Sequence, residues 1–160
     1  ISLRKRVNPK LNFNLKLVNL KREKPLYKNL KYKKILSYLS KMDNSKSDIG
    51  LVFRKKILET GTSNILFIRG KKVFTSKKDY YEGNTYKFFK TKIKRIIKKD
   101  ILVHELKKYD EIILIGSGKG VTSVKTIKQI GWKRKNLKQY KIFLKYYFSA
   151  IKKCNFYKFK

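Results

Sequence analysis

The residues best suited to chemistry lie in EIILIGSGKGVTSV, residues 111–124, where an apolar run ends in three closely spaced glycines. Backbone amides exposed by such glycines, together with the hydroxyl of Ser117, are suited to bind an anion. Two common phosphate motifs do not match, because a P-loop requires G-x-x-x-x-G-K-[ST] and a dinucleotide-binding turn requires G-x-G-x-x-G opening a helix. The stretch therefore predicts a tight turn between two strands, which either binds a small anion or serves only as a turn.

Glu59 is the second candidate, at the end of an apolar run in ILETGTSNILFI, residues 57–68. The chain contains only 10 Asp and Glu residues, and Glu59 is flanked by Ile57, Leu58 and Ile65. A buried carboxylate needs a cationic or hydrogen-bond-donating partner. We therefore expect either a buried Glu59 with such a partner or a surface pair with one of the many lysines.

A helix start is the third candidate, in YEGNTYKFF, residues 81–89, with Asn84 or Thr85 as the N-cap. The free amides of a helix N-terminus can bind a phosphate, although capping alone also explains the pattern. His104 is the single histidine and no cluster of ligands surrounds it, so we interpret it as a structural or surface residue. Cys154 is the single cysteine, which excludes an internal disulfide and a cysteine-based zinc site.

The composition indicates one folded domain with a core. The chain has 160 residues, 41% of them hydrophobic and 14% aromatic, which is too apolar for a disordered protein. No run of about 18 apolar residues predicts a membrane-spanning helix. The 44 Lys and Arg residues give a formal charge of +34, which by itself suggests a nucleic-acid or anionic-membrane partner. Because the lysines are spread along the chain among many Asn, Ile, Tyr and Phe residues, we favour a compositional bias and expect only salt-sensitive, non-specific binding.

Hydrophobic periodicity predicts the elements that position these residues. Helices are predicted at 33–42, 84–99 and 137–153, and 43–50 is predicted as a loop. Strands are predicted within 11–21 and at 51–53, 56–59, 64–68, 72–75, 101–103, 111–115 and 123–130. This order lacks strict strand–helix alternation, so we predict an α+β fold with a strand-rich centre and helices outside it.

The order of the motifs resembles the class IV aminotransferase family, the pyridoxal-phosphate (PLP) enzymes of fold type IV. ETGTSNILFIRGKKVFTS is similar to the glutamate strand pair of that family, and DEIILIGSGKGVTSVKTI to its phosphate turn. PLYKNLKYKKILSYLSKM, residues 25–42, is similar to the family's lysine segment, especially in its lyase members. The resemblance covers roughly residues 20–147 and implies a strand-rich pseudo-barrel flanked by helices.

The resemblance implies a role for each candidate residue. Lys31 would form the Schiff base with PLP and shuttle protons at the substrate carbon, with Lys33 and Lys34 as alternatives. Glu59 would pair with the pyridine nitrogen of the cofactor.

The resemblance also implies how the two ends of the site would be bound. Asn84, Thr85 and Ser117 would bind the cofactor phosphate, whereas the Gly118 amide would meet a substrate carboxylate. Lys119 is not expected to touch the phosphate.

The resemblance further implies that residues 25–160 form the PLP-binding C-terminal domain, that 1–24 lead into it, and that the family's N-terminal domain has no counterpart here. The implied activity is 4-amino-4-deoxychorismate lyase, which eliminates pyruvate to give 4-aminobenzoate for folate synthesis. A branched-chain or D-amino-acid aminotransferase is the alternative, and a basic nucleic-acid-binding protein on a degenerate fold is the second. A cytoplasmic homodimer with a small-molecule substrate and no membrane partner is expected.

Overall fold

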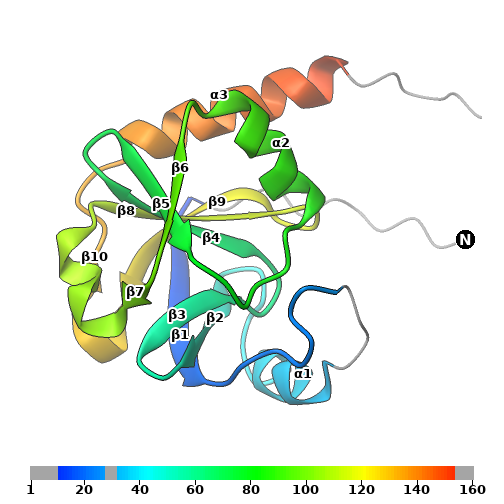
Figure 1. Ribbon diagram of the computed structural model, residues 1–160, viewed down its shortest axis with the longest axis vertical. Coiled ribbons are helices and arrows are strands. Elements are labelled where there is room, and N and C mark those ends of the chain that lie inside the picture. The colour runs from blue at the N-terminus through cyan, green and yellow to red at the C-terminus, as the bar shows by residue number, and fades with distance from the viewer. Residues whose placement is uncertain (1–10, 28–31, 154–160) are drawn as a thin grey trace, which may run out of the picture.

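The computed structural model describes residues 11–27 and 32–153, so Lys31 and Cys154 lie outside the described residues. The prediction of an α+β fold is confirmed, with a strand-rich centre and helices around it (Figure 1). Within the described residues the strands form one ten-stranded sheet, in which nine follow the order β6-β5-β4-β8-β9-β1-β2-β3-β7 and β10 pairs with β9 outside this path. The strands are β1 (Phe13–Asn19), β2 (Ser47–Phe53), β3 (Lys56–Thr60), β4 (Asn64–Arg69), β5 (Lys72–Ser76), β6 (Ile96–Lys99), β7 (Ile101–Leu102), β8 (Glu111–Gly116), β9 (Gly120–Ile127) and β10 (Trp132–Lys133).

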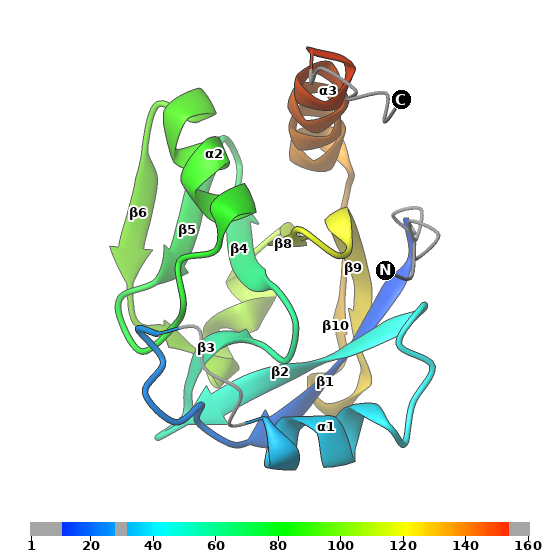
Figure 2. The ribbon, with the colours of Figure 1, turned by 90° about the vertical axis from the view of Figure 1, so that its right-hand side faces the viewer.

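The helices lie at two ends of the molecule. Helices α2 (Asn84–Lys92) and α3 (Lys138–Lys153) lie at one end, whereas α1 (Lys33–Leu39) packs at the other, beside β1 and β2 (Figure 1, Figure 2). Short 3-10 turns, η1 (Val103–Lys108) and η2 (Lys128–Ile130), connect strands. None of the helices in 11–27 and 32–153 is long and apolar enough to span a bilayer.

Three apolar clusters hold these layers together. The central one is enclosed by strands from both halves of the sheet and includes Phe13, Phe67 and Trp132. A second joins strands β4, β8 and β9 to α2 and α3, whose Phe89 and Phe143 rings lie 4.8 Å apart. Strand β8 reads as an unbroken apolar run because alternate residues enter these two clusters, so both of its faces are buried. A third cluster packs α1 on β1 and β2.

Two predicted boundaries were wrong. The helix predicted over 84–99 ends at Lys92, and β6 then pairs in parallel with β5. Ile96 and Ile97 pack into different apolar clusters on opposite faces of the sheet. The spacing of the apolar residues also fits a helix, but pairing with the neighbouring strand at the edge of the sheet decides the structure here. The loop predicted over 43–50 ends early, because β2 begins at Ser47 and pairs in parallel with β1. This extension places Asp48 in the interior, with no exposed surface.

Candidate functional site

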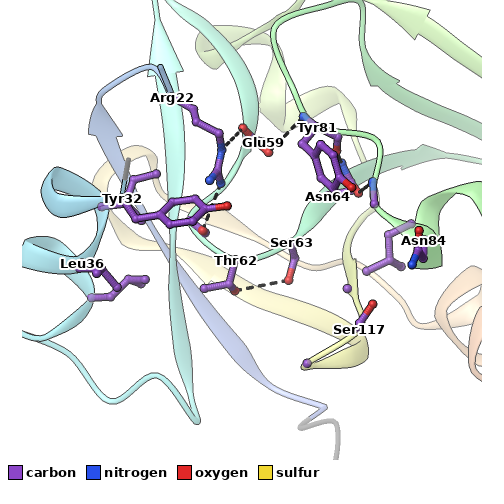
Figure 3. Close-up of a pocket in the computed structure, with 17 residues that line it drawn as sticks. Arg22, Tyr32, Leu36, Glu59, Thr62, Ser63, Asn64, Tyr81, Asn84 and Ser117 are labelled. Carbon is purple, nitrogen blue, oxygen red and sulfur yellow. Dashed lines mark hydrogen bonds and ion pairs between the residues drawn. The ribbon is translucent and has the colours of Figure 1, made fainter. Parts of the chain in front are cut away.

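A pocket of about 380 Å³ lies between the β3–β4 loop, the β8–β9 turn, the start of α2 and helix α1. Glu59, Asn84, Ser117 and Gly118, all predicted from the sequence, line it. Thr85 follows Asn84 in α2 but is not among the lining residues. Figure 3 shows Glu59 at one end of the pocket and Ser117 at another, with Asn84 on the Ser117 side.

Glu59 is buried, 3% exposed, and its partner is Arg22. The Arg22 Nε lies 2.8 Å from Oε1 of Glu59, and Nη2 donates to the Gly61 carbonyl at 3.3 Å. The guanidinium also lies 4.7 Å from the centre of the Tyr32 ring. Burial raises the pKa of Glu59 above its ordinary value, and the positive charge of Arg22 opposes that shift. The pocket therefore contains a buried ion pair at one end.

Asn64 fixes the chain that enters α2. Its Nδ2 donates to the Tyr81 carbonyl at 2.5 Å, and its Oδ1 accepts from the Gly83 amide at 3.1 Å. The prediction of Asn84 or Thr85 as N-cap was wrong, because the N-cap is Gly83 and it makes no side-chain capping bond. Asn84 is instead the first residue of the helix, exposed at the pocket wall.

The glycine-rich stretch forms the tight strand-to-strand turn expected from the sequence. Gly116 of β8 pairs with Gly120 of β9, so residues 117–119 make the turn. A Cβ at Gly116 would lie 3.0 Å from Ser63 Oγ and 3.3 Å from the Thr62 carbonyl. Glycine therefore lets the turn approach the β3–β4 loop closely, and the two segments form adjoining walls of the pocket.

Sequence reasoning missed several lining residues. Thr62 and Ser63 add hydroxyls, and their side-chain oxygens lie 3.4 Å apart. The signal for them was present in ETGTSN, where hydroxyl side chains follow the glutamate. The role of Arg22 could not be predicted from the sequence, because Arg22 is one of 44 Lys and Arg residues. Tyr81 was included only as part of a helix start.

The lysines of the described residues do not line the pocket. Lys33 and Lys34, the alternatives to Lys31, lie exposed on α1. Lys31 belongs to residues 28–31, which join Tyr27 to the pocket-lining Tyr32 and which also contain a second lysine, Lys28. Elsewhere, His104 is exposed, and within the described part of the chain no three His, Cys, Asp or Glu side chains form a potential metal site.

Comparison with known proteins agrees with this architecture. A family model described as amino-transferase class IV matches residues 4–127. Among curated protein sequences, none matches the chain significantly. Solved structures match closely in fold. A branched-chain aminotransferase from Thermoproteus uzoniensis is 18% identical with a TM-score of 0.72, covering 89% of this chain and 52% of that one.

Two further structures have similar values. An aminotransferase from Brucella abortus bound to PLP is 18% identical with a TM-score of 0.74, and the match covers 93% of this chain and 57% of the aminotransferase chain. A putative 4-amino-4-deoxychorismate lyase from Legionella pneumophila is 16% identical with a TM-score of 0.71, covering 94% and 59%. The chain therefore spans a little over half the length of these structures.

Proposed function

The chain belongs to the class IV aminotransferase family, and on that basis we propose that it binds pyridoxal 5′-phosphate in the pocket beside Glu59. One observation carries the proposal: residues from β3, from the start of α2 and from the β8–β9 turn, all expected at a cofactor site, line a single pocket. An aminotransferase of the same fold has been solved with PLP bound. The pocket volume of about 380 Å³ also lies in the range of small-molecule sites.

The donors in the pocket fit an anionic, ring-shaped cofactor. The Ser117 and Ser63 hydroxyls and the free amides at the start of α2 would hold the phosphate. Gly116 has no side chain, so the backbone of the turn is accessible to a ligand at this position. Glu59, at another end of the pocket, is the acid available to a protonated ring nitrogen (Figure 3). The net charge of +34 would favour capture of an anionic ligand.

Bound PLP would supply an electron sink for a carbanion at the substrate carbon. Glu59 would hold a proton on the ring nitrogen, and Arg22 would keep the Glu59 carboxylate ionised against the effect of burial. Tyr32 covers the Arg22 guanidinium and so limits the access of water to this pair. The Gly118 amide would bind a substrate carboxylate at the turn.

A lysine from residues 28–31 would hold the cofactor through its aldehyde, with loss of water, and would move the proton at the substrate carbon once the substrate amine has displaced it. Lys31 is our first assignment, and Lys28 is the alternative, since both belong to the segment that leads to Tyr32. Lys33 and Lys34 fit the role poorly, because they are exposed on α1 and do not line the pocket.

The bonded lysine can be identified directly. The protein would be incubated with PLP, reduced with borohydride, digested and examined by mass spectrometry for the pyridoxyl group. We expect the label on Lys31, with loss of label in Lys31→Ala and not in the control Lys33→Ala. A label that moves to Lys28 would correct the assignment within the segment. Labelling spread over surface lysines, with no preferred position, would refute a specific site.

For the reaction, we propose elimination of pyruvate from 4-amino-4-deoxychorismate. The similarity of residues 25–31 to lyase members of the family supports it. Amino transfer by a branched-chain or D-amino-acid aminotransferase is the alternative, favoured by the fold shared with such enzymes. Measuring pyruvate release against amino transfer to 2-oxoglutarate distinguishes the two, and transfer without pyruvate release would overturn the lyase assignment.

Two further expectations accompany this proposal. We propose a homodimer, which sedimentation would test.

The charge of +34 also favours a second candidate, a basic nucleic-acid-binding protein. That candidate requires tight, salt-dependent binding of nucleic acid together with no uptake of PLP.

A further inference from the structure

A buried carboxylate lies behind the pocket and outside the roles proposed so far. Asp48 on β2 is fully buried, and its Oδ1 accepts from the amide of Ile49 at 2.8 Å. Its Oδ2 accepts from the hydroxyls of Thr60 and Thr62, at 2.9 and 2.7 Å. Asp48 thus anchors the β3–β4 loop, one wall of the pocket, to the strand below it.

The same carboxylate is also bonded to the other wall. Lys119, in the β8–β9 turn, extends its Nζ to 2.9 Å from Asp48 Oδ2. The Lys119 side chain is 14% exposed, and its ammonium lies 4.5 Å from the centre of the Phe13 ring. This lysine is therefore held inside the protein, and it does not line the pocket.

Among the residues that the structure describes, none anchors Ser117 or Gly118 in this way. Ser117 and Gly118 are exposed, and a Cβ at Gly118 would meet nothing within 4 Å. A short exposed turn with open space around it samples several conformations unless a side chain restrains it. Lys119 provides that restraint from the residue next to Gly118.

We propose that Lys119 is a positioning residue: its ion pair with Asp48 holds the β8–β9 turn so that Ser117 faces the anionic end of the ligand. The inference rests on the proposed function, because it assigns the turn to the phosphate of PLP. Lys119 acts from behind the turn and contacts no ligand. A single buried carboxylate thus sets the spacing between the two walls, since it accepts hydrogen bonds from the β3–β4 loop and from the β8–β9 turn.

The test compares Lys119→Met with Lys125→Met. Lys125 is an exposed lysine on β9 of the same hairpin, so each variant loses one positive charge and the general attraction for anions falls equally. Each protein would be titrated with PLP and with pyridoxal, which lacks the phosphate. Hydrogen–deuterium exchange of the peptide that contains residues 116–120 would be measured without ligand.

We expect Lys119→Met to lower PLP affinity about tenfold, equivalent to ~1.4 kcal/mol, with pyridoxal affinity unchanged. Exchange in the turn should become faster, whereas Lys125→Met should match the wild type in all three measurements. Loss of PLP and pyridoxal affinity to the same extent would mean that Lys119 only stabilises the fold, and it would overturn the positioning role. A PLP affinity equal to that of the wild type would overturn it as well.

Lys119→Met leaves the buried Asp48 carboxylate without its cation, so a second variant is needed for the case in which the single variant fails to fold. The double variant Lys119→Met/Asp48→Asn removes that charge and should fold, yet it should still show the tenfold preferential loss of PLP. Recovery of the full preference for PLP in the double variant would refute the inference. A wild-type protein that binds neither PLP nor pyridoxal would instead refute the proposed function, which separates the two failures.

Discussion

Arg22→Met removes the cation that pairs with Glu59 in the described part of the chain, and it keeps an unbranched apolar side chain. Both side chains are buried, with exposed fractions of 7% for Arg22 and 5% for Glu59. After the substitution, the hydrogen bond to the Glu59 carboxylate that remains among residues 11–27 and 32–153 is the one from the Tyr81 amide, at 3.5 Å. The variant therefore leaves a carboxylate in the interior with little to offset its loss of water.

The magnitude follows from that burial. Removing one partner of a buried ion pair typically costs about 3–5 kcal/mol, a large part of the 5–15 kcal/mol by which domains are stable. Protonation of Glu59 would relieve part of this cost. Burial already raises the pKa of Glu59, and losing the opposing charge of Arg22 would raise it further. The folded variant would then hold a proton that the unfolded chain releases near its ordinary pKa of about 4.3.

The sign of the pH dependence follows. The stability of the variant should decline as the pH rises from about 4.3 through the raised pKa of the folded state. Urea denaturation of wild type and Arg22→Met should therefore show a smaller difference in unfolding free energy at pH 5 than at pH 8. The control is Arg22→Met/Glu59→Gln, which contains no ionisable group at position 59 and should recover stability mainly at pH 8. A loss below about 1 kcal/mol, or an equal loss at both pH values, would refute the buried-pair argument.

Two further predictions concern other parts of the hairpins. Asp110 accepts bonds from the Gly70 amide at 2.8 Å and from the Lys135 ammonium at 3.1 Å, and these hold its pKa below the ordinary value. Asp110→Asn should cost about 1 kcal/mol at pH 7, and thermal denaturation should show the difference vanishing as the pH falls through that lowered pKa; a loss that persists in acid would contradict this. Gly116→Ala places a methyl group 3.0 Å from Ser63 Oγ, so PLP affinity should fall about tenfold in a titration. Unchanged binding by Gly116→Ala would mean that the two walls need not approach closely.

Several features followed from local patterns. The apolar run of β8 predicted a strand, and the glycines after it predicted a turn. Both patterns act within a few residues, so they can be recognised without the tertiary structure. Helix α3 was predicted almost to the residue, since its apolar face repeats over several turns. Residues 93–99 were predicted wrongly as the end of a helix. The strand β6 within them has only four residues, two of them isoleucine, and so short a segment is compatible with a helix and with a strand.

The amino-acid sequence by itself determined which segments bring acids, hydroxyls and glycines to the site, and in what order along the chain. The tertiary structure decided the partners. Arg22 and Glu59 are separated by 37 residues, and Lys119 and Asp48 by 71. No local rule selects these two cations from 44, because every lysine or arginine on a solvated surface has nearly the same energy. Burial of the two carboxylates by the folded sheet makes one particular partner necessary for each.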